Sequence, residues 1–495
     1  MRSPTELRTT FAIRPAPPDR GQRRTSTVRA GVFGACILIL CLAGLSSLGV
    51  APFRSPDESA HVAYAVSIGH GTIPRKDEPG PRVIPGEHAD RIYTADHPPL
   101  FYILITGPLL LGIHTGHPLL GLHLARFESI LFSTGTVILT AALAGILLGG
   151  RRPEVAVTSA AVVATLGAFD FTSSQVYNDS LGALLSLSVL LATLLALRDG
   201  LRTGRCLLIV LTATLAIATR ASNAEIVALA AAGLVAAGAV HDTRRWRGAA
   251  VGALWVGVMG AVCFAAVGWF YLLNQSRYGH LTGRTQLWLA PRSVSSFLLS
   301  PSSYVNLGEQ TFANLAGVEH RGVLPWMLPT LQGGVIAIWS LTGVGLLWWL
   351  RHRPRLRPPR VSQLLMLLVV VHALAGLLYV AWWVHLGGRP NVRYLFPALP
   401  VVAVALARAV AGLPGGRFWA VLVVTMQFVM SAGYLAKLPA QWAGTGLWRA
   451  YPAALDQAGV PAPAVVTIGL LIGAIGGWLL CTRAILTVAP AEPDS

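Results

Sequence analysis

Long uncharged apolar runs recur along this chain, and they constrain its fold more than any other feature. The run 30–50 contains no Asp, Glu, Lys or Arg and is long enough to cross a bilayer. Of the 495 residues, 54% are hydrophobic and only 12% are charged, which is too little charge to cover a soluble protein of this size. Repeated apolar segments of this length predict an all-α polytopic membrane protein.

The apolar runs predict a transmembrane helix bundle of about twelve spans. The expected spans are 30–50, 126–148, 154–172, 180–197, 205–219, 223–240, 248–272, 327–350, 362–385, 393–411, 417–437 and 463–482. The further apolar segment 99–114 is assigned to a surface or re-entrant helix. That choice places the excess of loop Lys and Arg, and the basic tail, on the cytoplasmic side.

This topology divides the chain into two transmembrane modules with terminal tails. The divisions are a disordered basic tail at 1–29, a first module at 30–200, a second module at 201–485 and a cytoplasmic tail at 486–495. The first module carries an outer loop at 51–125 with juxtamembrane helices, and the second carries outer loops at 273–326 and 438–462. Both termini are then expected to be cytoplasmic.

Net charge and cysteine usage exclude several classes of protein. The formal net charge of +17 is spread over short loops between apolar runs, which membrane topology explains without a nucleic-acid partner. All five cysteines lie in apolar runs, and no spacing typical of a disulfide framework or a zinc site occurs. The sequence indicates no cofactor, and a divalent metal is left open without being indicated.

The segment Ser55–His61 places two adjacent acids, Asp57 and Glu58, directly after the first apolar run. One interpretation is structural, because Ser55 and Glu58 have the spacing of an N-terminal capping box. The other is catalytic. On a helix that begins near Asp57, the side chains of Asp57, His61 and Tyr64 share one face, as expected for the floor of a polar site.

Two further polar segments follow in the first module. His97 precedes Pro98 and Pro99, which interrupt any helix and place this histidine just before an apolar segment. Asp179 begins an expected span, and an acid there is costly if it faces lipid. We therefore expect Asp179 to point into the protein, at the same membrane face as Asp57.

The segment Gly388–Pro397 supplies the arginines of the predicted site. Arg393 lies at the outer end of an expected span, where snorkelling alone would explain it, yet a guanidinium also suits a phosphate. Arg389, Arg220 and Arg284 are weaker candidates for the same contact, and Tyr394 is a candidate for substrate binding.

Taken in this order, the four segments resemble the GT-C superfamily of membrane glycosyltransferases, in particular enzymes similar to protein O-mannosyltransferases and the lipid A aminoarabinose transferase. The resemblance covers 30–200 and then thins to the Arg-Tyr-Leu-Phe-Pro stretch at 393–397. It implies a sugar donor linked to a polyprenyl phosphate and transfer on the outer face. It also implies that Asp57 is the essential first-loop acid and Asp179 the second acid. Pro98 stands where some relatives have a lysine near the lipid phosphate, which leaves Arg393 as the preferred phosphate contact.

The sequence therefore predicts a glycosyltransferase of hexosyl or pentosyl type, inverting at the anomeric carbon. The expected catalytic residues are Asp57 as general base, Glu58 as its alternative, and Asp179. The expected substrate-binding residues are His61, Tyr64, Tyr93, His97, Arg389, Arg393 and Tyr394. Its partners are a lipid-linked donor, a glycan, lipid or protein acceptor, and the bilayer of a bacterial plasma membrane, with an extracytoplasmic site. The alternative is a transporter or flippase for a lipid-linked or anionic substrate.

Overall fold

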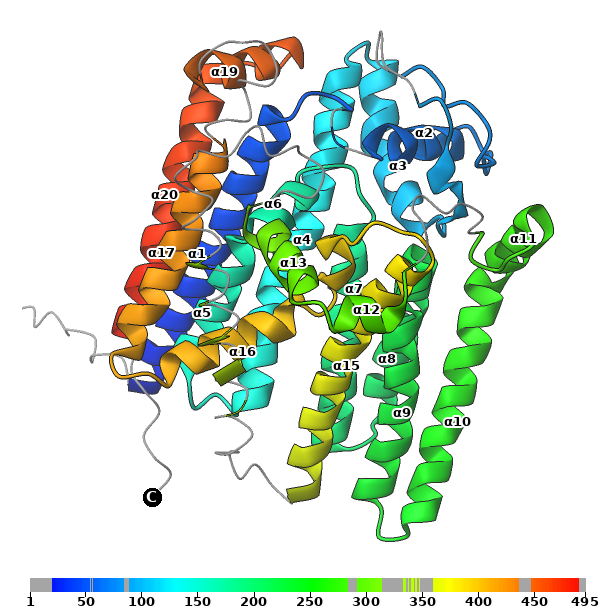
Figure 1. Ribbon diagram of the computed structural model, residues 1–495, viewed down its shortest axis with the longest axis vertical. Coiled ribbons are helices and arrows are strands. Elements are labelled where there is room, and N and C mark those ends of the chain that lie inside the picture. The colour runs from blue at the N-terminus through cyan, green and yellow to red at the C-terminus, as the bar shows by residue number, and fades with distance from the viewer. Residues whose placement is uncertain are drawn as a thin grey trace, which may run out of the picture.

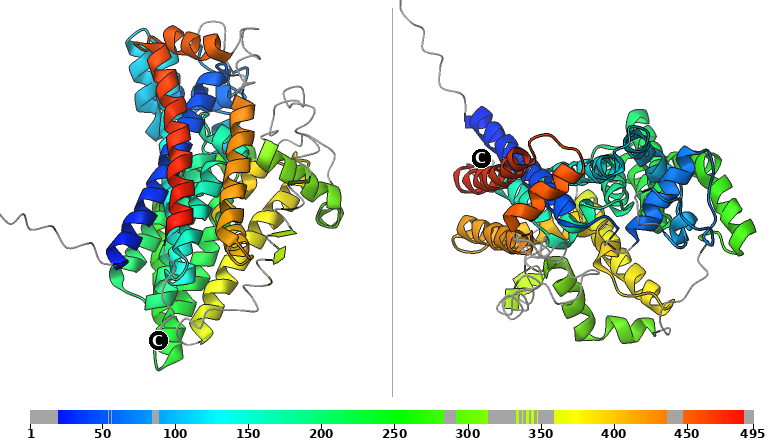
Figure 2. Two further views of the ribbon diagram at one scale, coloured as in Figure 1. Left: turned by 90° about the vertical axis from the view of Figure 1, so that its left-hand side faces the viewer. Right: turned by 90° about the horizontal axis from the view of Figure 1, so that it is seen from above.

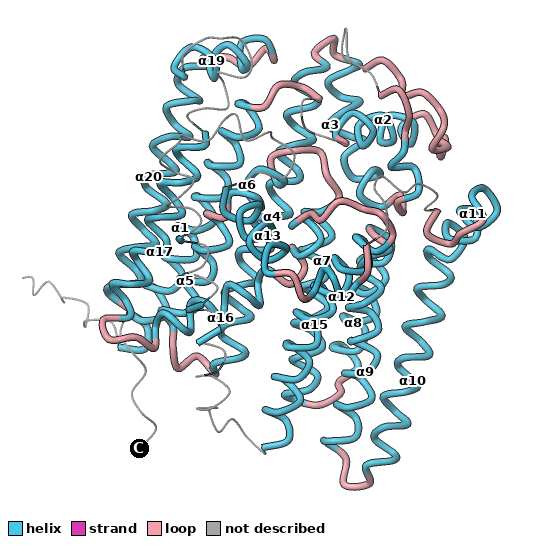
Figure 3. The backbone as a smooth tube through the Cα atoms, viewed as in Figure 1, coloured by secondary structure: helices cyan, strands magenta, loops and turns pink. Residues whose placement is uncertain are grey.

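The regular structure of this protein is helical. The computed structural model describes residues 20–53, 55, 57–83, 89–283, 292–313, 359–435 and 447–488, together with single positions between 333 and 347. Within these residues there is no strand, and helices are joined by mostly short loops (Figure 3).

The first part of the chain supplies most of the buried helices. Its elements are α1 (Arg20–Gly49), α2 (Glu58–Gly69), η1 (Tyr93–Asp96), α3 (Leu100–His114), α4 (Pro118–Leu148), α5 (Pro153–Ala164), α6 (Gly167–Ser173), α7 (Asp179–Asp199), α8 (Thr203–Thr219), η2 (Ala221–Asn223) and α9 (Ala224–His241).

The remaining elements surround this core. They are α10 (Arg245–Cys263), η3 (Phe264–Gly268), α11 (Trp269–Tyr278), α12 (Val294–Leu298), α13 (Pro301–Ala313), α15 (Pro359–His385), η5 (Val392–Leu395), α16 (Leu399–Ala411), α17 (Gly416–Leu435), α19 (Leu447–Gln457) and α20 (Pro463–Thr487).

Within the described residues, eight helices are long and apolar enough to cross a membrane, or nine if the bent pair α5–α6 forms one broken span. The expected count of twelve is not confirmed. Two of the expected spans, 205–219 and 393–411, correspond to the shorter apolar helices α8 and α16. Most of a third, 327–350, lies outside the described residues.

The helices form one bundle in which α1, α17 and α20 lie on one side and α8, α9 and α10 on the other (Figures 1 and 2). Every residue of α5 is buried, including the polar Glu154, Thr158 and Ser159, which places this helix at the centre of the bundle. Gly34 of α1 meets α20, where a Cβ would lie 2.9 Å from the carbonyl oxygen of Gly477. Small residues allow this close approach of two spans.

The segment predicted as a non-spanning helix forms α3, whose 15 residues are fewer than a span requires. At its end, a Cβ on Gly112 would lie 2.4 Å from the Cα of Gly121 in α4. The chain therefore turns directly from α3 into α4. Figure 1 shows α2 and α3 beside each other at the same end of the bundle.

The N-terminal boundary differs from the prediction. Residues 20–29 were expected to belong to a disordered tail, but α1 begins at Arg20. The Arg24 side chain donates to the carbonyl of Gly150, beyond the end of α4, and this contact ties the extension of α1 to the bundle. Residues 1–19 and 489–495, the rest of the expected tails, lie outside the described residues.

Candidate active site

The charged side chains of the predicted site come from helix ends that are far apart in sequence. Asp57 precedes α2, Asp179 is the first residue of α7, Arg220 directly follows α8, and Arg393 lies in η5. Ends of apolar helices are where charged groups can leave the hydrocarbon while remaining inside the protein. The fold brings these four residues together.

Asp57 has a strained backbone and a well-held carboxylate. Its φ of 74° lies in the left-handed region. Its side chain makes no capping hydrogen bond to α2, so the carboxylate does not stabilise the start of that helix. Instead, the Tyr93 hydroxyl donates to Oδ1 at 2.7 Å and Arg393 Nη2 donates to Oδ2 at 2.9 Å. The Asp57 side chain keeps 30% of its surface exposed.

Opposing effects act on the pKa of Asp57. Burial alone would raise it, but the charge of Arg393 and the hydrogen bonds from Tyr93 and Arg393 lower the pKa of this carboxyl below its usual value. Asp57 is therefore ionised at neutral pH.

Arg393 connects Asp57 to the second predicted acid. Its Nη1 lies 3.9 Å from Asp179 Oδ2, and Asp179 Oδ1 also pairs with Arg220. The Arg393 guanidinium lies over the Tyr177 ring, 4.8 Å from its centroid, and Arg220 lies 5.8 Å from that of Tyr394. We call Asp57, Asp179, Arg220 and Arg393 the bridged cluster. The predicted proximity of the two carboxylates is therefore present.

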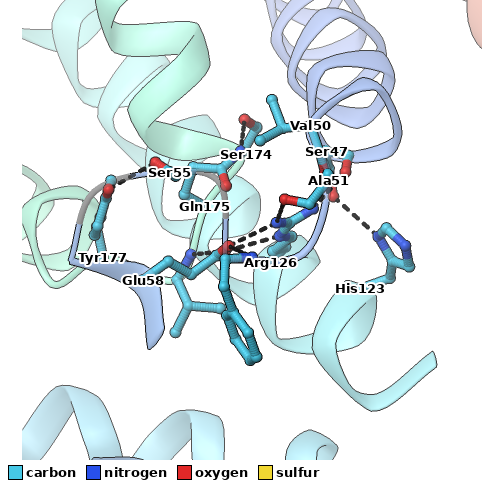
Figure 4. A network of polar contacts seen from close by, with 12 residues as sticks. Ser47, Val50, Ala51, Ser55, Glu58, His123, Arg126, Ser174, Gln175 and Tyr177 are labelled. Atoms are coloured by element: carbon cyan, nitrogen blue, oxygen red, sulfur yellow. Dashed lines mark hydrogen bonds and ion pairs between the residues drawn. The ribbon is translucent and has the colours of Figure 1, made fainter. Parts of the chain in front are cut away.

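Glu58 points away from this cluster into a buried ion pair with Arg126 of α4. Arg126 Nε and Nη2 lie 2.8 and 2.6 Å from the two Glu58 oxygens, and both side chains are 0% exposed. The backbone N–H of Val176 also donates to Glu58 at 3.1 Å. Arg126 Nη1 in turn donates to the carbonyls of Ser47 and Val50 at 2.6 and 3.0 Å (Figure 4). This buried pair joins α1, α2, α4 and the loop before α7.

The capping-box interpretation of Ser55 and Glu58 is wrong. The Glu58 carboxylate is engaged by Arg126, and the Ser55 hydroxyl lies 2.6 Å from the Tyr177 hydroxyl (Figure 4). Helix α2 begins at Glu58, with Asp57 as its N-cap residue. A buried arginine competes for the glutamate more strongly than a backbone N–H does, because both partners of that bond are charged.

Two of the predicted sugar-binding side chains, His61 and Tyr64, pack against Tyr102 of α3, and the ring of His97 stacks on that of His61 with centroids 6.1 Å apart. His61 Nδ1 lies 2.9 Å from the Tyr102 hydroxyl, and the Tyr64 and Tyr102 rings stack with centroids 3.9 Å apart. The Tyr64 hydroxyl donates to the His97 carbonyl at 3.1 Å. Burial and the neighbouring His97 lower the pKa of His61 to about 3, so its imidazole is neutral at physiological pH.

The loop that carries His97 is held from the other side by α11 and the residues after it. Lys76 Nζ lies 3.1 Å from Asp96 Oδ2 and donates to the Gly283 carbonyl at 2.8 Å. Asn274 of α11 donates to the Asp96 carbonyl at 3.0 Å. These contacts join the segment between α2 and α3 to α11 and the residues that follow it.

Not every predicted residue reaches the site. Arg389 is exposed, and its backbone carbonyl accepts a hydrogen bond from Trp383 Nε1. Arg284 and Pro56 lie outside the described residues. Sequence reasoning missed Arg126, although a basic residue at the start of an apolar segment is a signal for a buried acid partner. It also gave no separate role to Tyr177, which contacts both Ser55 and Arg393.

In the part of the chain that the structure describes, no group of three or more His, Cys, Asp or Glu side chains is placed to bind a metal ion. The bridged cluster pairs each carboxylate with an arginine instead. The chemistry that this arrangement offers is that of an ionised acid beside fixed positive charge.

Comparison with known proteins identifies the fold. No family model matches this chain, and neither does any curated protein. Among solved structures, ArnT from Cupriavidus metallidurans bound to undecaprenyl phosphate is 15% identical, with a TM-score of 0.50 over 91% of this chain and 75% of that one. The archaeal oligosaccharyltransferase AglB from Archaeoglobus fulgidus, in complex with an inhibitory peptide and a dolichol-phosphate, is 13% identical. It gives a TM-score of 0.41 over 92% of this chain and 56% of that one. The bundle has the GT-C fold that the sequence motifs predict.

Proposed function

We propose that this protein is a membrane glycosyltransferase that moves a sugar from a polyprenyl-phosphate donor to an acceptor hydroxyl at the extracytoplasmic face. The observation that carries the proposal is the Asp57 carboxylate, which is ionised, partly exposed and held by Tyr93 and Arg393 in a GT-C fold. The likeness to ArnT, which was crystallised with undecaprenyl phosphate, supports the choice of donor class.

In the proposed reaction, the acceptor oxygen attacks the anomeric carbon as the bond from that carbon to the phosphate oxygen breaks. The acceptor proton passes to Asp57, and polyprenyl phosphate leaves with the electron pair. A positioned general base of this kind contributes roughly 10²–10⁴ in rate. Attack from the face opposite the leaving group inverts the anomeric configuration.

Asp57, rather than Glu58, is assigned the role of base. The Glu58 carboxylate accepts from Arg126 and Val176 and is inaccessible to an acceptor. Asp57 keeps an exposed edge, and its lowered pKa leaves it unprotonated and able to accept a proton at neutral pH.

Arg393 and Arg220 supply the fixed positive charge of the site. Arg393 keeps Asp57 ionised and lies within ion-pair distance of Asp179, while Arg220 pairs with Asp179. As negative charge develops on the departing phosphate, preorganised guanidinium groups stabilise it. Asp179 orients the two arginines. Of the residues expected to bind the sugar, Tyr93 lies beside Asp57 and is assigned to that role, whereas His61 and Tyr64 are buried against Tyr102 and support the site from behind.

Radiolabelled sugar on a synthetic polyprenyl-phosphate donor, presented to the purified protein in lipid nanodiscs, tests the proposal. We expect label to pass to an acceptor in an envelope extract, with free polyprenyl phosphate formed in equal amount. Transport of the intact donor across a vesicle membrane, without cleavage of the sugar–phosphate bond, would instead support the transporter alternative. Label that stays on the donor with every sugar and acceptor fraction would overturn the proposal.

A further inference from the structure

A fully buried histidine lies behind the segment that carries Arg393. His372 of α15 is 0% exposed, and its two ring nitrogens face different partners. Nε2 lies 3.0 Å from the carbonyl oxygen of Pro397, and Nδ1 lies 3.1 Å from Glu225 Oε1 in the first turn of α9. Nδ1 forms no hydrogen bond among the described residues, and the Glu225 carboxyl group, at ion-pair distance, is its polar neighbour.

The chemistry of one contact fixes how His372 bonds to the segment. A carbonyl oxygen only accepts, so Nε2 carries a hydrogen and donates it to Pro397. On the other edge of the ring, Glu225 Oε1 lies 3.1 Å from Nδ1. These two contacts, on opposite edges of the ring, hold it in the orientation that reaches Pro397.

The two residues are connected to the segments that carry both site arginines. Pro397 ends the stretch that begins with Arg393, and Glu225 follows Arg220 through η2, where the Asn223 N–H donates to the Arg220 carbonyl at 3.2 Å. The opposite end of the Arg393 segment is held by Gln310 of α13. Its side chain donates to the Pro390 carbonyl at 3.2 Å and accepts from the Val392 N–H at 3.0 Å.

We propose that Glu225 and His372 are positioning residues: they hold the end of the segment 390–397, and thereby place Arg393 within reach of Asp57 and Asp179. Gln310 holds the beginning of the same segment. With both ends held, the guanidinium is presented to the two carboxylates without rearrangement when substrate arrives.

Hydrogen–deuterium exchange of the intact protein in nanodiscs tests this directly. In His372→Phe, the backbone amides of 391–396 should exchange about tenfold faster or more, because the segment loses the contact at its end. Exchange within about twofold of wild type in that segment would overturn the proposal. The matched control is His241→Phe, since His241 of α9 also reaches a carbonyl, that of Leu197, at 2.9 Å but lies away from this segment.

A second pair of variants covers the case in which His372→Phe does not fold. Glu225→Ala leaves Nδ1 without its neighbour and should also speed exchange of 391–396. Glu225→Gln keeps a polar side chain of the same size beside Nδ1, so exchange of 391–396 should stay slow. Equal exchange in Glu225→Ala, Glu225→Gln and wild type would contradict the proposal.

Activity gives an independent readout that rests on the proposed function. When Arg393 loses its place, burial of Asp57 is no longer offset, its pKa rises, and the acid limb of the pH–rate profile moves to higher pH. We expect that movement in Glu225→Ala and not in Glu225→Gln or His241→Phe.

If exchange changes as expected while no variant or wild type transfers sugar, the proposed function fails and the positioning inference stands. An unmoved acid limb in an active Glu225→Ala would overturn the inference and leave the function in place.

Discussion

Two adjacent acids, Asp57 and Glu58, enter two different kinds of carboxylate–arginine arrangement. The buried pair of Glu58 and Arg126 is closed to solvent, and the charged partners are further satisfied by backbone groups. In the bridged cluster, Asp57 keeps 30% of its side chain exposed, and its arginine is also within reach of Asp179. Asp57, with its left-handed backbone, directly precedes α2, which begins at Glu58. The side chains of these two neighbours face different arginines, Arg393 for Asp57 and Arg126 for Glu58.

The difference teaches that the charge of an acid does not reveal its task, whereas its remaining accessibility does. A fully satisfied buried pair has no lone pair left for a substrate and contributes to the arrangement of α1, α2 and α4. The bridged cluster has fixed charge and an exposed edge, which are the requirements for proton transfer. The comparison predicts that changes to the buried pair affect folding and changes to the bridged cluster affect chemistry.

The largest expected effect on folding comes from Arg126→Met. It leaves the Glu58 carboxylate buried without a partner and should cost about 3–5 kcal/mol in the free energy of unfolding. Thermal unfolding in detergent, together with the yield of monodisperse protein, measures this loss. The double variant Glu58→Gln with Arg126→Met should recover much of it, because the buried charge is gone. Equal unfolding temperatures for Arg126→Met and wild type would show that the pair has no structural role.

The next effect distinguishes chemistry from folding. In Arg393→Gln, the pKa of Asp57 should rise because burial is no longer offset by the adjacent positive charge. The acid limb of the pH–rate profile for transfer should then move upward by about 1 pH unit or more, the shift typical of a neighbouring arginine. Since Asp57 must be ionised to accept a proton, activity at acidic pH falls first. An unchanged profile in a folded Arg393→Gln protein would remove Arg393 from the account of Asp57.

A smaller change in the same direction is expected for Tyr93→Phe. This substitution removes the 2.7 Å hydrogen bond to Asp57 Oδ1 but leaves Arg393 in place. Transfer should fall by about ten- to a hundredfold, as for loss of one hydrogen bond to a charged group, with the acid limb moving less than in Arg393→Gln. Steady-state kinetics across pH measures both effects. A larger loss than in Arg393→Gln would reverse the order of the two contacts.

These contrasts also explain what the sequence could and could not predict. Apolar runs predict the helix bundle because the bilayer imposes length and composition on each span. The proximity of Asp57 and Asp179 followed from topology, since both residues were expected at span ends on one face. The division of labour between Asp57 and Glu58 did not follow, because it depends on Arg126, whose side chain meets Glu58 from 68 positions away in the chain. Likewise, the role of Arg393 beside two carboxylates depends on where η5 docks, which no local pattern encodes.

The smallest expected effect is that of a chelator. Because the bridged cluster pairs carboxylates with arginines, EDTA should leave the rate of transfer within about twofold of its starting value. Assays of the purified protein before and after chelation and dialysis measure this. Loss of activity that Mg²⁺ or Mn²⁺ restores would show that a metal takes part and would require a different account of the two acids.

The most direct test of the central claim is the rate of sugar transfer by Asp57→Asn, measured beside its thermal unfolding. The account predicts an unfolding temperature close to that of wild type and a loss of transfer of about 10²–10⁴-fold, the contribution of a general base. Transfer by folded Asp57→Asn at a rate near that of wild type would contradict it.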